Sequence, residues 1–200
     1  MGGDITLRPI RLAIFASGGG SNAEKIIQYF AIHASIKISL VVSNKSDAGV
    51  LKIAEEHLIK SLIINKNSFW GSNEVIDYLR DEKIDYIILA GFLWLVPKQI
   101  VEAFPNKILN IHPSLLPKYG GKGMYGHFVH DAVKVNNETV SGMTIHLVNE
   151  KFDDGDIIFQ AKCSLNEEMS ASEIAFRVLE LEHKYYPIVI EKYVLKHNVA

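Results

Sequence analysis

The stretch Arg11-Leu12-Ala13-Ile14-Phe15-Ala16-Ser17-Gly18-Gly19-Gly20-Ser21-Asn22 decides the fold, because it predicts a strand, a glycine turn and the start of a helix. Its apolar half is continuous rather than alternating, which is typical of a strand buried on both faces of a parallel sheet. A helical pattern follows over residues 23–30. This arrangement directs free backbone N–H groups at an anion, and Ser21 and Asn22 are expected N-caps that add side-chain hydrogen bonds to a phosphate.

Gly18, Gly20 and Ala23 also satisfy the spacing of a dinucleotide-binding fingerprint. That interpretation requires a carboxylate at the end of the second strand to hold a ribose. The predicted second strand, residues 38–42, is followed by Ser-Asn-Lys, and the first carboxylate is Asp47. The pattern therefore favours a monophosphate site over NAD. The alternative is a glycine turn that serves tight packing alone.

Strand and helix patterns alternate through the first half of the chain. Further strands are predicted at residues 61–64, 85–91 and 107–112, with helices at 49–57 and 73–81. Such alternation implies right-handed crossovers and a parallel sheet. We therefore expect an α/β fold of the Rossmann-like type, a mostly parallel sheet with helices on both faces. Ligands bind such sheets at the carboxyl ends of the strands.

The second half is predicted to contain a helix at 127–135, strands at 140–148 and 157–161, and a long C-terminal helix. Ser170 and Glu173 form a capping box at the start of that last helix. Pro187 is expected to kink or restart it, with a second segment ending near Leu195. Glu182-His183 on this helix is, as an isolated pair, expected to face solvent or to pack rather than to form a site.

The stretch Asn110-Ile111-His112-Pro113-Ser114-Leu115-Leu116-Pro117 carries the chemistry. Side chains alternate along a strand, so Asn110 and His112 face one side and Leu109 and Ile111 the other. An amide can donate to a developing oxyanion, and an imidazole can donate, accept or carry charge near neutral pH. Alone, the pattern also fits a strand end with a structural histidine.

An acidic turn, residues 149–156, follows the strand 140–148. Asp and Gly there fit hairpin chemistry, and a carboxylate that orients His112 is the functional alternative. Asp153, Asp154 and Asp156 resemble the start of a calcium loop, but the glycine and the distal Glu are misplaced, so no metal is expected. Lys118 lies just before the glycine-rich loop 119–126 and Lys122 lies within it, and we expect both lysines to be solvated.

Composition excludes several classes of protein. A net charge of −2 over 200 residues, 48% of them hydrophobic, gives no general attraction to nucleic acid or acidic membranes. The single Cys163 cannot form an internal disulfide, and no zinc-type Cys/His spacing occurs. The N-terminus has no signal-peptide pattern and no apolar run spans a bilayer. We expect a soluble, cytoplasmic protein of one domain.

The quoted motifs, with Leu89-Ala90-Gly91-Phe92, the Asp153-x-Gly155 turn and Glu182-His183, occur in the order of a known family. Over residues 10–195 the chain resembles the glycinamide ribonucleotide transformylases, folate-dependent phosphoribosylglycinamide formyltransferases of purine synthesis. The resemblance implies a formyltransferase-type fold, with 10-formyltetrahydrofolate as co-substrate and no metal. It also implies a cis Leu116-Pro117 bond. In such a single domain, residues 1–9 would be a loose lead-in, 11–97 the phosphate-binding half, and 98–200 the catalytic and folate-binding half.

The resemblance also assigns site residues. The catalytic residues would be Asn110, His112 and Asp153. The substrate-binding residues would be Gly20, Ser21, Asn22, Gly91, Pro113 and Glu182. The folate-binding residues would be Leu93, Leu95, Val96, Asn149 and Phe152, mainly through backbone. The partners would be small molecules only, bound to a monomer or a homodimer.

Three positions and one loop depart from the family pattern. Trp94 stands where an arginine is expected, Asp156 replaces a frequent proline, Leu179 replaces a polar contact, and the loop 119–126 is longer. The alternatives are another formyl-handling folate enzyme, such as a formyltetrahydrofolate hydrolase or a methionyl-tRNA formyltransferase, and a non-catalytic nucleotide-binding module. The two enzymes are expected to need additional domains. The module leaves the Asn110, His112 and Asp153 set unexplained.

Overall fold

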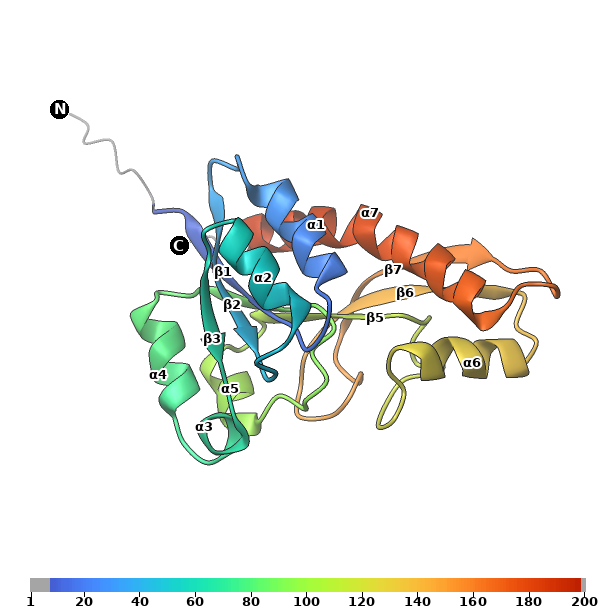
Figure 1. Cartoon of the computed structure of the whole chain (residues 1–200), viewed down its shortest axis with the longest axis horizontal. Helices are drawn as coiled ribbons and strands as arrows, with labels where there is room; N and C mark the ends of the chain where they lie inside the picture. The colour runs from blue at the N-terminus through green and yellow to red at the C-terminus, as the bar shows by residue number, and fades with distance from the viewer. Residues whose placement is uncertain (1–7, 199–200) are drawn as a thin grey trace.

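A twisted seven-stranded sheet runs through the described part of the chain, which in this computed structural model is residues 8–198 (Figure 1). The expected lead-in therefore lies mostly outside the described residues. The strands are β1 Ile10–Phe15, β2 Ile36–Ser43, β3 Lys60–Ile63, β4 Tyr86–Leu89, β5 Ile108–His112, β6 Val140–Leu147 and β7 Ile157–Ser164. Their order in the sheet is β3-β2-β1-β4-β5-β6-β7.

The first five strands are parallel, β6 is added antiparallel to β5, and β7 is added antiparallel to β6. The mostly parallel Rossmann-like sheet predicted from the sequence is confirmed. The order reverses between β1 and β4, where chain connections leave in opposite directions. This is the position at which open α/β sheets bind ligands.

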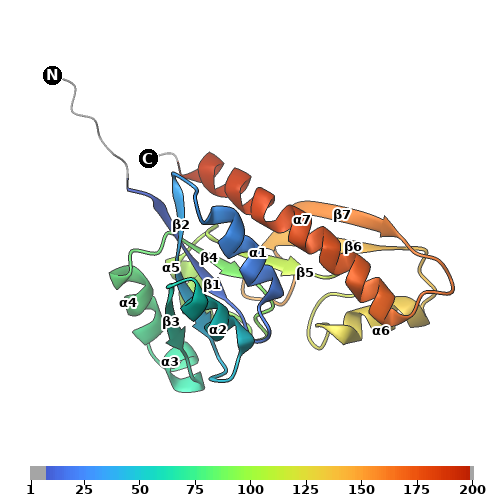
Figure 2. The same cartoon turned by 45° about the horizontal axis from the view of Figure 1, so that its top comes forward.

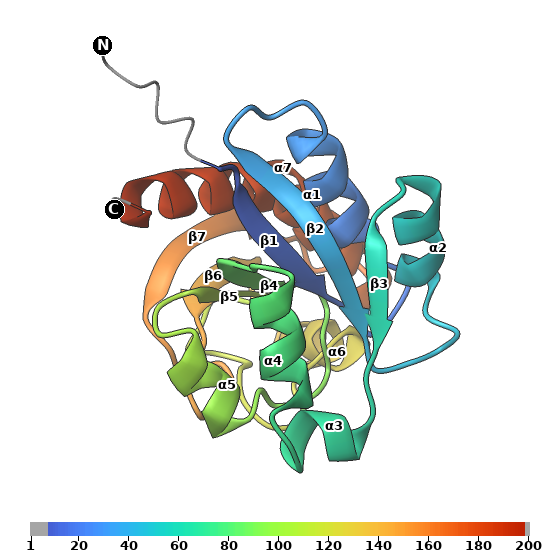
Figure 3. The same cartoon turned by 90° about the vertical axis from the view of Figure 1, so that its left-hand side faces the viewer.

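Helices cover both faces of the sheet (Figures 2 and 3). They are α1 Ser21–Phe30, α2 Gly49–Glu56, α3 Lys66–Trp70, α4 Glu74–Asp81, α5 Lys98–Ala103, α6 His127–Val135 and α7 Ala171–His197. Leu12 and Ile14 of β1 pack in the core shared by α1, α2 and α7. Ala13 and Phe15 point to the opposite core, shared by α3, α4 and α5. The continuous apolar pattern of β1 is thus explained by burial on both faces.

Three details differ from the sequence-based expectation. Helix α1 has Gly20 as its N-cap, not Ser21 or Asn22, and no side chain caps it. Gly20 is in the left-handed region (φ 85°), and a Cβ there would lie 2.9 Å from Val50, so glycine is required twice over. Helices α3 and α5 were not predicted, because five and six residues are too few to give a periodic pattern.

The third difference concerns Pro187. The expected restart is absent, and α7 is one helix of 27 residues that runs through the proline. Tyr186, Pro187 and Ile190 are all buried. Packing against the sheet therefore compensates for the hydrogen bond that a proline removes from a helix. The capping box of Ser170 and Glu173 at the start of α7 is confirmed.

Among residues 8–198, no helix combines the length and the apolar character needed to cross a bilayer.

We predict that Gly142→Ala destabilises the protein. A Cβ at this position of β6 would lie 2.0 Å from the carbonyl oxygen of Ala161 on β7, so the two strands would have to move apart. Overpacking of this kind costs about 1–3 kcal/mol, and each kcal/mol lowers the melting temperature of a chain this size by about 2–4 °C. Thermal unfolding is the measurement. Gly19→Ala, where a Cβ meets nothing within 4 Å, is the control; equal melting temperatures for the two variants would contradict this explanation.

Candidate active site

A cavity of about 680 Å³ opens at the carboxyl ends of the central strands. Most of the site residues expected from the sequence line it, namely Asn22, Gly91, Leu93, Leu95, Val96, Asn110, His112, Pro113, Phe152, Asp153 and Glu182. Gly20, Ser21 and Asn149 do not line it. Asn149 instead shapes the acidic turn, since its side chain accepts from the N–H of Lys151 (2.9 Å) and donates to Asp154 (3.3 Å).

Asp153 is the centre of the polar wall of this cavity. Its side chain is 10% exposed. One carboxylate oxygen accepts from the backbone N–H of Gly121 (2.9 Å) and lies 3.4 Å from Nδ1 of His112, and the other lies 3.4 Å from Nδ2 of Asn110. Burial raises the pKa of Asp153, but the neighbouring His146, the charge on His112 and the Gly121 N–H together hold it below its usual range. Asp153 is therefore ionised at neutral pH.

His112 is almost fully buried and has acceptors on both sides of its ring. Nε2 lies 2.7 Å from the carbonyl oxygen of Tyr119, so this nitrogen carries the proton and donates it there. Nδ1 faces Asp153. Burial lowers the pKa of His112, and the charge of Asp153 and the Tyr119 carbonyl only partly offset it. The lowered pKa favours the neutral imidazole before ligands bind, and this effect of burial could not be read from the motif.

His146 is a member of this cluster that the sequence analysis did not identify. It lies directly opposite Asn110 in the antiparallel pairing of β5 with β6, so the two side chains share one face. Its Nδ1 lies 2.7 Å from the carbonyl oxygen of Leu147, and its Nε2 lies 3.1 Å from Nδ2 of Asn110 and 3.7 Å from a carboxylate oxygen of Asp153. These contacts fix the orientation of the Asn110 amide. The histidine was visible in the predicted strand 140–148, but its partner depends on the register.

Buried hydrogen bonds fix the chain that leaves β5. Thr144, opposite His112 in the β5–β6 pairing, donates to the carbonyl of Ser114 (2.6 Å) and accepts from the N–H of Leu116 (3.0 Å). Gln160 of β7 donates to Leu116 and Thr144. The Leu116-Pro117 bond is cis, as the resemblance implied. The backbone after His112 is therefore positioned by the added antiparallel strands.

Glu182 connects the long helix to the glycine turn. Its carboxylate accepts from Nδ2 of Asn22 at 2.6 Å, while the Oδ1 atom of Asn22 has no partner among the described residues. Burial raises the pKa of Glu182 to about 7, although the Asn22 hydrogen bond opposes the shift. The expectation that this residue faces solvent is wrong, because α7 buries it in the cavity wall, where the resemblance also placed it. Its protonation changes near neutral pH.

The apolar part of the wall is tied to the glycine turn. Ser17 donates its backbone N–H to the carbonyl of Gly91 (3.1 Å), and its hydroxyl accepts from the N–H of Leu93 (3.0 Å). Ser17 was quoted in the glycine motif but was given no role. The loop after β4 is therefore held against the loop after β1, which leaves Leu93 exposed on the cavity side.

His130 is a second cavity residue that the sequence analysis did not single out. It belongs to the buried face of α6 together with Val129 and Val133. Its Nδ1 has no hydrogen-bond partner in the described residues, and burial lowers its pKa. The sequence signal that could have identified His130 is its position on the apolar face of the helix predicted at residues 127–135.

The described residues contain no group of three or more His, Cys, Asp or Glu side chains placed to hold a metal ion. Asp153 of the acidic turn lies instead beside His112 and His146.

A family model described as "Formyl transferase" matches residues 10–190 of the chain. The chain belongs to this family. A chloroplastic phosphoribosylglycinamide formyltransferase of Arabidopsis thaliana is 42% identical over 90% of the chain and 64% of that relative. The phosphoribosylglycinamide formyltransferase of Haemophilus influenzae is 36% identical over 95% of the chain and 92% of that relative. The chain thus spans less than two thirds of the plant relative but nearly all of the bacterial one.

Solved structures agree with this family membership. The crystal structure of phosphoribosylglycinamide formyltransferase from Anaplasma phagocytophilum matches with a TM-score of 0.85 at 31% identity, covering 94% of the chain and 87% of that structure. Glycinamide ribonucleotide transformylase 1 from Symbiobacterium toebii matches with a TM-score of 0.86 at 29% identity, covering 96% and 91%. The formyltransferase-type fold is confirmed.

We predict that Glu182→Gln stabilises the protein in a pH-dependent way. Below pH 4.5 the carboxyl is protonated in both the folded and the unfolded chain. As the pH rises from there to about 7, the unfolded chain ionises while the folded chain retains the proton, so the native protein loses stability. Glutamine keeps an acceptor for Asn22 and has no charge. The variant should gain up to about 3 kcal/mol at pH 8 and little at pH 4.5.

Urea unfolding of both proteins at the two pH values measures this gain. A gain that is the same at pH 4.5 and pH 8 would contradict the assignment of the raised pKa to Glu182.

Proposed function

We propose that this protein transfers the formyl group of 10-formyltetrahydrofolate to the amine of glycinamide ribonucleotide, giving formylglycinamide ribonucleotide and tetrahydrofolate in de novo purine biosynthesis. The observation that carries the proposal is the convergence of Asn110, His112 and Asp153 in one cavity wall. The same cavity reaches the N-terminal turn of α1 through Asn22. An acyl-transfer cluster next to a phosphate-binding turn fits a nucleotide acceptor.

The nucleotide is proposed to bind between the glycine turn and α7. Free N–H groups at the start of α1, with Gly20 and Ser21, would hold its phosphate. Asn22 offers an unused acceptor, and Glu182 offers a carboxyl group beside it. Gly91 and Pro113 would lie along the ribose and glycinamide. A role in binding the substrate would explain why the protein has a carboxyl group at this buried position, although burial opposes its ionisation.

The folate is proposed to bind the apolar part of the cavity, against Leu93, Leu95, Val96 and Phe152, with Asn149 shaping the turn beyond them. These residues fit such a ligand because they form an apolar wall beside a few polar groups, as is usual for sites that take flat organic molecules. In this proposal residues 11–97 mainly hold the phosphate, and residues 98–200 mainly supply the catalytic and folate-binding groups.

In the proposed reaction the amine nitrogen attacks the formyl carbon and an anionic tetrahedral species forms. The bond from that carbon to N10 of the folate then breaks, and one proton passes from the attacking nitrogen to N10. In the ligand-free protein one amide N–H of Asn110 makes a long 3.4 Å contact with Asp153. That N–H would instead donate to the oxyanion and stabilise it. Asp153 would stabilise His112 when its Nδ1 takes up the proton, directly or through water.

The second oxyanion donor would be Nε2–H of His112. In the ligand-free protein this N–H is bonded to the carbonyl of Tyr119, so substrate has to displace that carbonyl before the donor is free. Tyr119 has a positive φ of 55° and starts the glycine-rich loop, where further glycines adopt positive φ. We propose that this loop changes conformation when substrates bind.

The function is tested by following formyl transfer by absorbance, with and without glycinamide ribonucleotide. Turnover that requires the nucleotide is the expected result. Loss of the formyl group without nucleotide would indicate the hydrolase alternative, and nucleotide binding without turnover would indicate the non-catalytic module. The proposal that the protein is cytoplasmic, and is a monomer or a homodimer that binds neither nucleic acid nor membranes, stays a prediction.

We predict that His112→Ala lowers kcat by at least about 10²–10³, because removal of one oxyanion donor typically has that effect. Nucleotide binding, measured by calorimetry, should be retained, since His112 is not placed at the phosphate. His57→Ala is the control, because His57 is exposed at the end of α2. A folded His112→Ala protein with wild-type turnover would contradict the assigned role.

A further inference from the structure

Trp94 is held at the edge of the cavity by an aromatic cluster made of Phe15, Phe69, Trp70, Phe92 and Trp94. The ring centroids of Trp94 and Trp70 are 4.6 Å apart with an interplanar angle of 38°. Phe69 lies 5.7 Å and Phe92 6.2 Å from Trp94. The cluster begins at the fully buried Phe15 in the sheet, whose ring is 5.4 Å from that of Phe92. It therefore anchors Trp94 to the core.

The short helix α3 provides the support behind Trp94. Asn65 caps this helix by a reciprocal capping box with Ser68, and Gln99 of α5 donates to the carbonyls of Phe69 and Trp70 (3.4 and 3.3 Å). Trp70, the last residue of α3, is 39% exposed. It is not among the residues that line the cavity, whereas Trp94 is. The two tryptophans thus have separate positions, one in the wall and one behind it.

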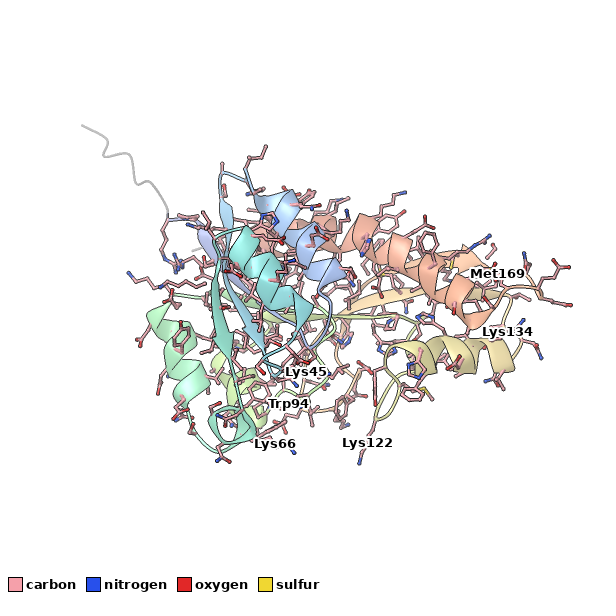
Figure 4. All side chains as sticks on the ribbon, in the orientation of Figure 1. Lys45, Lys66, Trp94, Lys122, Lys134 and Met169 are labelled. Atoms are coloured by element: carbon pink, nitrogen blue, oxygen red, sulfur yellow. The ribbon has the colours of Figure 1, made fainter. Side chains whose placement is uncertain are left out.

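The indole of Trp94 presents a different surface from the arginine expected at this position in the family. It is half-buried, and the cavity that it lines also has two exposed apolar side chains, Leu93 and Phe152. Figure 4 shows Trp94 on the same side of the molecule as Lys45, Lys66 and Lys122. A fixed aromatic surface favours stacking with a flat ring. Because its partners already restrict its orientation, little conformational freedom is lost when a ligand binds.

We propose that the side chain of Trp94 contacts an aromatic ring of the folate, its pterin or its aminobenzoyl group, and thereby determines folate affinity in this protein. The inference rests on the proposed function, since it requires a folate in this cavity. It assigns to the side chain a contact that the sequence analysis left to the backbone of residues 93–96. It also gives α3 a role, which is to hold Trp94 in place for the ligand.

The first test compares Michaelis constants. Trp94→Ala should raise KM for 10-formyltetrahydrofolate about 5–20-fold, the size expected for loss of one stacked aromatic side chain. KM for glycinamide ribonucleotide should stay within about twofold, and Trp94→Phe should restore most of the folate affinity. Trp70→Phe is the matched control, because it changes the same aromatic pair without changing the cavity wall. An unchanged folate KM in folded Trp94→Ala, or an equal rise in Trp70→Phe, would overturn the proposal.

The second test does not depend on turnover. The chain contains two tryptophans, so Trp94 is the single tryptophan of the Trp70→Phe variant. Saturating tetrahydrofolate should lower the rate constant for acrylamide quenching of its fluorescence, because a stacked ring shields the indole. An unchanged rate constant, with folate binding verified by calorimetry, would overturn the proposal. If wild-type protein binds tetrahydrofolate but transfers no formyl group, the proposed function is contradicted. The quenching experiment still tests the contact between Trp94 and the folate in that case.

The two rings of the folate are distinguished by competition. A tetrahydropterin and p-aminobenzoylglutamate are each tested as inhibitors of the wild-type and Trp94→Ala proteins. The fragment whose inhibition weakens in the variant is the one that contacts Trp94. If neither weakens, the contact is excluded.

Discussion

The burial of the Asp153 carboxylate is the constraint on which the site depends. A buried charge without partners costs several kcal/mol, so a chain that places one inside must surround it with donors. Here Asn110 of β5 and the backbone N–H of Gly121, in the loop after Pro117, donate to it, and the ring of His146 on β6 lies 3.7 Å away. The antiparallel pairing of β5 with β6 aligns Asn110 with His146 and thus brings two of these segments to the carboxylate. The site therefore requires the pairing of β5 with β6.

Helix α7 fixes the cavity from the other side of the sheet. The hydroxyl of Tyr186, which is fully buried, lies 2.9 Å from the carbonyl of Leu89, at the end of β4, and 3.2 Å from that of Leu109, near the start of β5. Tyr193 donates to Asn106, just before β5 (2.9 Å). One helix therefore contacts both central strands and also carries Glu182. This explains why the packing around Pro187 has to keep α7 continuous.

The features predicted correctly from the sequence are those with local signals. The double-sided burial of β1, the glycine turn and the capping box of Ser170 follow from short stretches of chain, and the family motifs indicated Asn110, His112 and Asp153, which the structure brings together in one cavity wall. Features that arise from distant contacts were missed. The contact of His146 with Asn110 depends on strand register, the lowered pKa of His112 depends on burial, and the raised pKa of Glu182 depends on the packing of α7. Helix α3 was too short to predict, so the support for Trp94 was not visible.

The central claim is that Asp153 acts through His112 as one unit. It is tested most directly by a double-mutant cycle on kcat for formyl transfer, using His112→Ala, Asp153→Asn and the double variant, because residues that act as a unit are non-additive. The account predicts that the double variant is about as slow as the slower single variant. If the two single losses instead multiply in the double variant, Asp153 and His112 act independently and the account is contradicted.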